Sequence, residues 1–600
     1  MKRSAAFALF PLGLLVLLAG VGPSALSAHP GHGDHAQDAN YVFTGLTERF
    51  LAAATRFSPS EATALGEHKF DAQLPDITAT GRSVRRGEWA AILAALEWVN
   101  PAELNRPNQV DYALLRNELQ YRIWTNDVLQ EWAWNPQYYN DIAAGSLYTL
   151  AARDFAPWDV RLKAATARME ALPAFLRESR KQLDPEQVPQ VFAETVAKQN
   201  AGILEIAQGM LAPHADALQG ADRARFDASL AGLAAAVADQ QTWLETVLVP
   251  SAKGSFRLGT RLYDQKMQFA LMSDLTRPVL KARALQAKAG IRAEMYQLAR
   301  QVLTGRAGAP LPARPTPKQQ QAGIEAALQL SYAQRPPRAG LEQRARETLA
   351  KATDFVRQQG FVAMPDGPVK VITMPKFQQG NAVAYNDPPG VFEKSGENFY
   401  AVSPIPADWS DAQAASFLSE YNDYMINDLS IHEAMPGHYL QLDHANRSAN
   451  VLRAYLGSGP FVEGWAVYAE GMMADAGYLN GDPLFKLTVL KMRLRSVTNT
   501  LLDIGIQTEG MSRAQAMDLM QKGAFQAERE AAGKWVRASL SSVQLLSYFT
   551  GYSEHMALRE EAKRRWGKSY TLRRYNDAVL SFGSPPVKYV RAMMFGLPVR

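Results

Sequence analysis

The chain has 600 residues, of which 47% are hydrophobic, and carries a formal net charge of +5. Because it is longer than the ~250–300 residues at which one hydrophobic core stops growing, we expect more than one subdomain. The sequence contains no cysteine, which excludes disulfide bonds, thiolate metal ligands, a cysteine nucleophile and the lipid-modified cysteine of a bacterial lipoprotein.

Residues 1–28 have the pattern of a signal peptide. Lys2 and Arg3 precede an apolar run that extends to Gly20, and the small residues of the segment 25–28 suit cleavage. The alternative is an uncleaved membrane anchor, which the shortness of the apolar run disfavours, since a spanning helix needs ~20 apolar residues. We therefore expect a periplasmic or secreted protein that is not stably inserted in the membrane after the leader is removed.

The next segment, residues 29–41, contains three histidines, His29, His32 and His35. Such a segment can collect transition metal ions from its surroundings. Isolated histidines near a terminus lack supporting hydrogen-bond partners, however. We predict a disordered tail with no catalytic role.

A helical subdomain is predicted over residues 42–305. Apolar residues recur at helical spacing from Ala284 to Val302, with Pro278 in the first turn of the expected helix and Gly305 just past its end. Prolines are frequent from residue 306 to residue 340, so this stretch is the predicted linker. The catalytic subdomain is then expected over residues 341–600.

Three short strands are predicted at the start of this second subdomain, over residues 369–372, 382–385 and 399–402, with Pro/Gly turns between them. In many zinc peptidases a strand beside the metal pairs with the extended backbone of the substrate. The overall prediction is a mainly α, cleft-containing fold with a small β-sheet near the active site.

The segment I-H-E-A-M-P-G-H holds the first candidate site residues, His432, Glu433 and His438. A capping-box pattern begins at Ser410, and the apolar stripe behind it predicts one helix that places His432 on its buried side. Zinc-binding histidines on a helix normally stand four positions apart, whereas these two are six apart. A straight helix would separate them by ~120° around the axis and ~9 Å along it. We therefore expect Pro436 and Gly437 to remodel the helix so that His438 reaches the ion.

The third predicted ligand is Glu463, on a helix that begins near Pro460. Glu470, seven residues later on the same face, is the predicted hydrogen-bond partner of a ligand. His444 is a rival to His438 as a ligand and is otherwise a supporting or surface residue. Two imidazoles and one carboxylate with an open fourth position are the donor set of catalytic zinc, so Zn2+ is the predicted cofactor and Glu433 the general base.

The segments F-Y-A-V-S-P-I-P-A-D-W, I-H-E-A-M-P-G-H-Y-L-Q and F-V-E-G-W-A-V-Y-A-E resemble the bacterial family called domain of unknown function 885, from about residue 45 to the C-terminus. The stretch from Glu463 to Glu470 is also similar to the third-ligand helix of gluzincin zinc aminopeptidases. This resemblance implies a helical zinc-peptidase fold and peptidase activity, with Glu463 rather than Glu470 as the ligand.

The resemblance also points to Tyr548, within the family pattern Gln544-x-x-x-Tyr548-x-x-Gly551, as a donor of a hydrogen bond to the developing oxyanion. The alternative is a tyrosine of the helix core. The sequence departs from the family at Ser542-Val543, where Pro-Gly is usual, at Ala538, where a tyrosine is usual, and at Gln507, where a histidine is frequent. These departures concern substrate recognition more than metal binding.

The predicted function is that of an exported zinc metallopeptidase acting on short peptides. The alternatives are a zinc amidase or esterase with a non-peptide substrate, and a non-enzymatic periplasmic protein that binds metal or peptide. If the enzyme removes C-terminal residues, Lys588 or Arg591 are candidates to hold the substrate carboxylate. Basic residues near the C-terminus are interspersed with acidic ones, so no nucleic-acid partner is expected. The sequence does not define an oligomeric state.

Overall fold

The computed structural model of the protein describes residues 34–306, 311–374, 383–393, 396–447 and 450–599. The predicted signal peptide, His29 and His32 lie outside these ranges. The first helix begins at Asp34 and therefore includes residues 34–41 of the predicted disordered tail. No helix within the described ranges combines the length and apolar character that crossing a membrane requires.

The first part of the chain is helical, as the sequence predicts. Its helices are α1 (Asp34–Phe57), α2 (Pro59–Ala64), α3 (Ala79–Glu97), α4 (Arg106–Trp124), α5 (Glu131–Trp134), α6 (Pro136–Ala152), α7 (Trp158–Gln182), α8 (Gln190–Gln199), α9 (Ala201–Ile206), α10 (Gly220–Trp243), α11 (Val249–Ser251), α12 (Gly259–Leu271) and α13 (Arg277–Leu303). Proline lies in the first turn of α13, and Gly305 beyond its end has a φ of +79°, as expected for a helix terminator.

The second part contains helices and three short strands. Its helices are α14 (Pro317–Tyr332), α15 (Leu341–Gln359), α16 (Asp411–Glu420), α17 (Asp423–Glu433), α18 (His438–Asn446), α19 (Val451–Tyr455), α20 (Gly459–Asp475), α21 (Pro483–Thr508), α22 (Arg513–Ala524), α23 (Glu528–Leu540), α24 (Ser547–Trp566), α25 (Leu572–Leu580) and α26 (Val587–Phe595). The strands are β1 (Val369–Thr373), β2 (Ala384–Asp387) and β3 (Asn398–Val402). The fold is thus mainly α with a small sheet, as predicted.

The three strands form one sheet in the order β1-β3-β2. β1 pairs with β3 in parallel, with Val371 opposite Tyr400, and β2 pairs with β3 antiparallel, with Asn386 opposite Tyr400. β2 is therefore an edge strand. Its position in the sequence agrees with the prediction, except that Ala382 lies outside the described residues.

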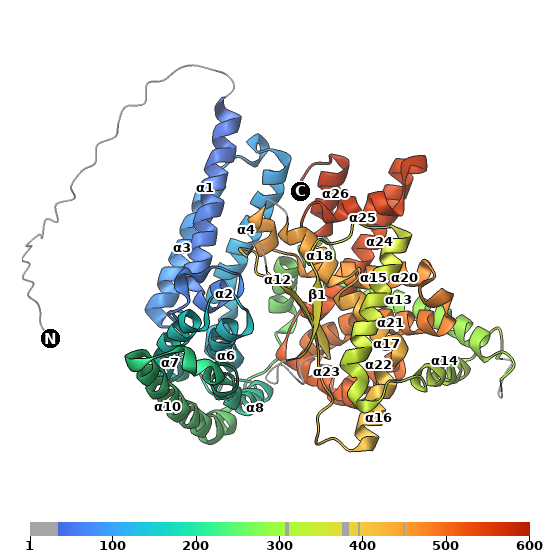
Figure 1. Ribbon diagram of the computed structural model, residues 1–600. Coiled ribbons are helices and arrows are strands. Elements are labelled where there is room, and N and C mark those ends of the chain that lie inside the picture. The colour runs from blue at the N-terminus through green and yellow to red at the C-terminus, as the bar shows by residue number, and fades with distance from the viewer. Residues whose placement is uncertain (1–33, 307–310, 375–382, 394–395, 448–449, 600) are drawn as a thin grey trace, which may run out of the picture.

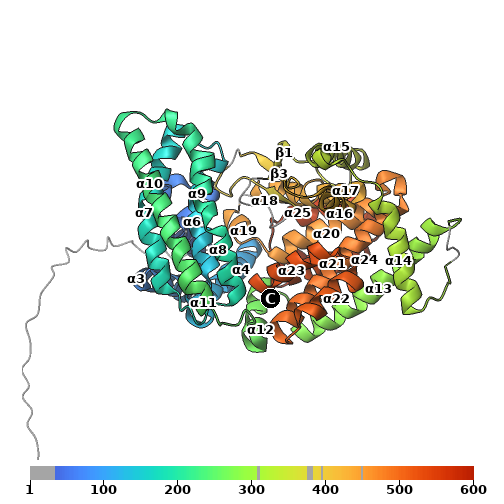
Figure 2. The same cartoon turned by 90° about the horizontal axis from the view of Figure 1, so that it is seen from below.

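The helices form two groups, which Figure 2 shows side by side, with α4, α19 and α18 between them. One group contains α6, α7, α8 and α10, whose apolar residues form a core that runs from Ile77 to Ala252. The other contains the sheet and the helices from α13 onward, coloured green to red in Figure 1. A buried ion pair joins two of the helices between the groups, Arg453 of α19 and Asp111 of α4.

The hydrophobic cores divide the chain at a different place from the predicted linker 306–340. Residues of α12 and α13 share one core with α14 and α21, among them Leu280, Ile324 and Leu494. α14 also begins with a complete capping box at Thr316. The proline-rich stretch therefore encloses a packed helix, and α12 and α13 belong with the second part of the chain.

Candidate metal centre

His432 and Glu433 are the last two residues of α17. The predicted single helix from Ser410 is in fact two helices, because α16 ends at Glu420 and a new one starts after Asn422. The Asn422 side chain accepts hydrogen bonds from the backbone N–H groups of Tyr424 and Met425, which caps α17. The capping box at Ser410 is present as predicted, but it belongs to α16.

The turn 434–437 separates the two histidines. The backbone of Ala434 leaves the helical region, with φ −129° and ψ −84°, and α18 starts at His438. A Cβ atom on Gly437 would collide with the carbonyl oxygens of Ile431 and His432. Glycine is therefore needed for close backbone approach rather than for a positive φ. The helix stops and restarts at the Pro-Gly dipeptide, which is a larger remodelling than the predicted bulge.

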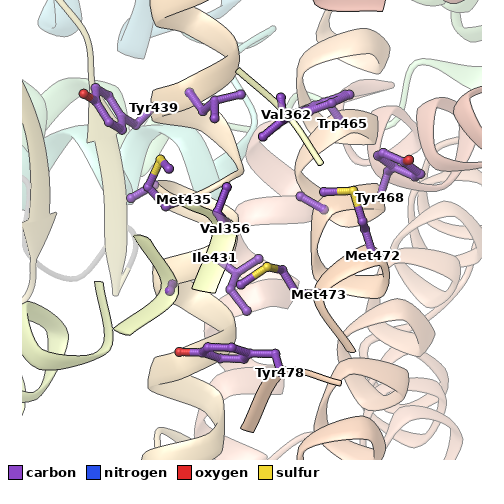
Figure 3. Close-up of a cluster of buried hydrophobic side chains, with 14 of the residues drawn as sticks. Val356, Val362, Ile431, Met435, Tyr439, Trp465, Tyr468, Met472, Met473 and Tyr478 are labelled. Carbon is purple, nitrogen blue, oxygen red and sulfur yellow. The ribbon is translucent and has the colours of Figure 1, made fainter. Parts of the chain in front are cut away.

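α20 carries the two glutamates and fixes the turn. The indole N–H of Trp465 donates to the carbonyl of Pro436 at 2.9 Å. Figure 3 shows Ile431 and Met473 meeting between α17 and α20, within the largest apolar cluster around the site. Gly464 packs directly on Gly551 of α24, where a Cβ on either residue would strike the other helix. This crossing brings the start of α24 close to Glu463.

The structure brings His432, His438 and Glu463 together as a possible metal site. The Nε2 atoms of His432 and His438 lie 3.7 and 3.5 Å from Oε2 of Glu463. These separations are longer than hydrogen bonds, and this carboxylate oxygen is buried without a hydrogen-bond partner among the described residues. The two imidazole rings are nearly perpendicular, with centroids 4.8 Å apart. Three donor atoms therefore surround one small volume.

Glu470 orients the first histidine. Nδ1 of His432 donates to Oε1 of Glu470 at 2.6 Å, which turns the Nε2 side of the ring toward Glu463. Burial alone would lower the pKa of His432, but the carboxylates of Glu463 and Glu470 outweigh burial and hold that pKa well above its ordinary value. For the carboxyl group of Glu463, burial acts to raise the pKa, but the two imidazoles outweigh burial and hold the pKa below its usual range. The site thus favours a positive charge held between carboxylates.

Asp428 is a neighbour of this pair that the sequence analysis did not identify. It lies one helical turn before His432 and is 1% exposed. Burial raises its pKa well above the ordinary value, and the negative charge of Glu470 adds to the effect. The i, i+4 spacing from His432 is the signal that would have indicated it.

Glu433 faces the sheet. The backbone N–H of Asn386, in edge strand β2, donates to Oε2 of Glu433 at 3.1 Å. Burial raises the pKa of Glu433, while His432 and His438 lower it; the net effect is a pKa above the ordinary value. A carboxylate with a raised pKa is a stronger base than an exposed one, as a general base requires.

Tyr548 lies at the start of α24. Burial and the charge of Glu463 raise its pKa to about 12, so the hydroxyl is neutral at physiological pH. Nη2 of Arg537 donates to this hydroxyl at 3.4 Å. The partly buried ring also packs against the apolar cluster of Leu545 and Ala538, so the tyrosine has structural contacts as well.

The departure at Val543 has a conformational consequence. Val543 has a φ of +71°, a region that β-branched residues rarely adopt, and the resemblance places a glycine there. Its N–H donates to Asp503 at 3.0 Å and its side chain is 1% exposed. In the turn that leads into Tyr548, Val543 therefore adopts a backbone conformation that normally requires glycine.

Three other candidates lie away from the donor cluster. His444 donates from Nε2 to the carbonyl of Ala363 at 3.2 Å, so the rival ligand is engaged elsewhere. Lys588 lies 3.4 Å from Asp274, and Arg591 lies 2.6 Å from Glu561 on the surface. The two cations proposed for a substrate carboxylate are thus paired with acidic side chains.

The chain resembles known proteins over most of its length. A family model described as "Bacterial protein of unknown function (DUF885)" matches residues 59–594. A "putative lipoprotein of unknown function" from Shewanella oneidensis is 32% identical, with a TM-score of 0.78 over 92% of this chain and 99% of its own. A "putative lipoprotein" from Colwellia psychrerythraea is 16% identical, with a TM-score of 0.69 over 93% and 98%, and shows the fold alone. No curated protein matches.

Proposed function

The chain belongs to the bacterial protein family of unknown function 885. We propose that it is an exported zinc-dependent metallohydrolase that cleaves short peptides. The observation that carries the proposal is the arrangement of His432, His438 and Glu463 around one small volume, with Glu433 beside them. The similarity of the Glu463–Glu470 stretch to the gluzincin ligand helix supports it.

The donor set fits zinc. Two ligand atoms bound tetrahedrally at Zn–N and Zn–O distances of ~2.0–2.2 Å are ~3.4 Å apart. The observed separations of 3.5 and 3.7 Å from Glu463 are close to this value. The buried oxygen of Glu463 without a partner also fits, because a buried carboxylate oxygen normally has a hydrogen bond or a cation. His432, His438 and Glu463 would hold the ion.

Zinc at this position would polarise a water molecule and the scissile carbonyl. Glu433 would accept a proton from that water and pass it to the leaving amine. Glu470 would keep His432 in the required tautomer through the 2.6 Å hydrogen bond. Tyr548, protonated at neutral pH, would donate a hydrogen bond to the oxyanion that develops on the substrate.

The edge strand β2 favours a peptide over another substrate. The Asn386 N–H points away from β3 and reaches Glu433, and in an antiparallel pair the outward groups recur at every second residue. The backbone of Ala384 therefore faces the same side as that of Asn386. The Asn386 N–H is engaged by Glu433, so an extended peptide would pair with this edge through the backbone of Ala384, which would place the peptide along the general base.

Export is part of the proposal. The leader-like residues 1–28 and the lipoprotein descriptions of the two structural relatives support a periplasmic or secreted location. The chain has no cysteine for a lipid anchor, so we propose that the processed protein is free of the membrane.

The experiment has two parts. Metal analysis of the purified protein should give one zinc ion per chain. Hydrolysis of a peptide library, compared with a panel of esters and non-peptide amides, should show peptide cleavage that a chelator abolishes and zinc restores. Cleavage confined to esters or non-peptide amides would favour that alternative class. Zinc or peptide binding without any hydrolysis would favour the non-enzymatic alternative, although that role gives no reason for a general base at position 433.

A further inference from the structure

Helix α23 carries two cationic side chains, Lys534 and Arg537, of which Arg537 contacts Tyr548. Arg537 of α23 donates to the Tyr548 hydroxyl and to Oε1 of Gln544, each at 3.4 Å. Tyr548 in turn interacts electrostatically with Glu463 and His432. Arg537 therefore contacts the same tyrosine whose electrostatic environment includes Glu463 and His432.

Lys534 lies one turn before Arg537, on the same face of α23. It is partly buried, and its Nζ donates to Oδ1 of Asn499 on α21 at 3.3 Å. In the part of the chain that the structure describes, neither Lys534 nor Arg537 has a carboxylate oxygen within 4.0 Å. Among the described residues, the ammonium group of Lys534 therefore contacts a neutral amide oxygen, that of Asn499, and no carboxylate.

The neighbouring cations are compensated. Lys491 lies 2.8 Å from both oxygens of Glu420, and Arg495 pairs with Glu530. These acidic residues are thus engaged by cations other than Lys534 and Arg537. A partly buried cation without an anion is costly, because it loses hydration and gains no ion pair.

The environment of Lys534 shows this cost. Burial lowers its pKa well below the ordinary value, and the positive charges of Arg495 and Arg537 lower it further. An anion placed between Lys534 and Arg537 would remove the penalty and would be held by two charged donors. The exposed side chain of Arg537 leaves the position open to a ligand.

We propose that Lys534 and Arg537 bind the free C-terminal carboxylate of the substrate peptide. This inference rests on the proposed peptidase function and specifies it, since a peptide held by its C-terminus next to Tyr548 is cut near that end. The enzyme then releases C-terminal residues or short C-terminal fragments, and an amidated peptide is a poor substrate. The two side chains replace the candidates Lys588 and Arg591.

The test uses peptide binding, which does not depend on catalysis. Zinc-loaded full-length Glu433→Gln protein is titrated calorimetrically with N-acetyl-trialanine as the free acid and as the C-terminal amide. The acid should bind roughly 10- to 100-fold more tightly, the range that charge-assisted hydrogen bonds support. Adding Lys534→Gln or Arg537→Gln should reduce this ratio to near one. Arg537 is exposed, so that variant tests the proposal even if Lys534→Gln folds poorly.

Lys522→Gln is the matched control, because it removes an exposed positive charge from the adjacent helix α22 and should leave the ratio unchanged. Equal binding of acid and amide to the Glu433→Gln protein, or a ratio that survives both substitutions, would overturn the carboxylate site. Wild-type hydrolysis tests the peptidase function separately. If the acid and the amide are cleaved equally, only the carboxylate site is contradicted. If no cleavage of either peptide is seen, the peptidase function is contradicted, and the ratio of the binding affinities still decides the carboxylate site.

Discussion

Nδ1 of His432 and Oε1 of Glu470 lie 2.6 Å apart, in a hydrogen bond that joins the end of α17 to α20. Because a carboxylate can only accept, this contact keeps a proton on Nδ1, so Nε2 is the nitrogen that would bind a metal ion beside Glu463. Both residues are almost enclosed, with side-chain exposures of 13% and 2%. One contact thus links the two helices that carry the predicted ligands and orients the ring of His432.

Glu470→Ala should weaken zinc binding about 10- to 100-fold, because loss of a ligand's hydrogen-bond partner has this effect in other zinc sites. The measurement is zinc affinity by competition with a chromophoric chelator. Glu294→Ala, which removes an exposed carboxylate from α13, should leave the affinity unchanged. Equal affinities in the two variants would remove Glu470 from the site.

Gly437→Ala should destabilise the fold by about 1–3 kcal/mol and reduce zinc binding. Its Cβ would meet two carbonyl oxygens of α17, so the turn must move, and His438 is the next residue. Gly145→Ala in α6 is the control. Its Cβ meets open space, and alanine in a helix interior is favoured over glycine by about 0.5–1 kcal/mol. Thermal unfolding should shift in opposite directions, and a stable, zinc-binding Gly437→Ala protein would refute the account of the turn.

His438→Gln should lose zinc, whereas His444→Gln should retain it. The structure places Nε2 of His438 beside Glu463 and bonds His444 to the carbonyl of Ala363. Both substitutions remove one imidazole from α18, so each serves as the control for the other. Metal content after dialysis decides between them, and the reverse result would make His444 the ligand.

Tyr548→Phe should lower kcat about 100- to 1000-fold, the loss seen when an oxyanion donor is removed, without changing the zinc content. The raised pKa of about 12 means that Tyr548 stays protonated up to about pH 10 or 11. Any fall in the wild-type rate with rising pH below about pH 10 therefore does not come from Tyr548, and the same fall should be seen in the Tyr548→Phe variant. If kcat is unchanged, the tyrosine belongs to the helix core alone.

Much of the fold could be predicted from local patterns. The 284–302 periodicity with Pro278 and Gly305 predicts α13 closely, and short runs rich in apolar residues between Pro/Gly turns predict the three strands. The prediction of one helix from Ser410 was wrong because the apolar stripe continues through Tyr421 at helical spacing, while Asn422 starts a new helix. Whether the chain forms one long helix, as the apolar spacing favours, or two helices, as the capping residue Asn422 favours, depends on tertiary packing. The spacing of apolar residues does not contain that information.

The candidate site could be predicted as far as residue types and spacing allow. His432, His438 and Glu463 do lie together, and the Pro-Gly argument correctly excludes a straight helix. The contact of Glu433 with Asn386 and that of Lys534 with Asn499 could not be predicted, because they join residues 47 and 35 positions apart. Long-range pairs of this kind depend on how the helices pack.

Replacing Glu433 by glutamine tests most directly the central claim that the protein is a zinc-dependent peptidase. Wild-type protein and the Glu433→Gln variant should bind zinc equally, because Glu433 is not one of the three predicted metal ligands. The variant should retain less than about 1% of the peptide hydrolysis, because general acid–base catalysis contributes ~100- to 10,000-fold to the rate. Zinc content and hydrolysis are measured on the same preparations. Equal zinc content with lost hydrolysis is the result that we predict, and undiminished hydrolysis by zinc-loaded Glu433→Gln would contradict the account.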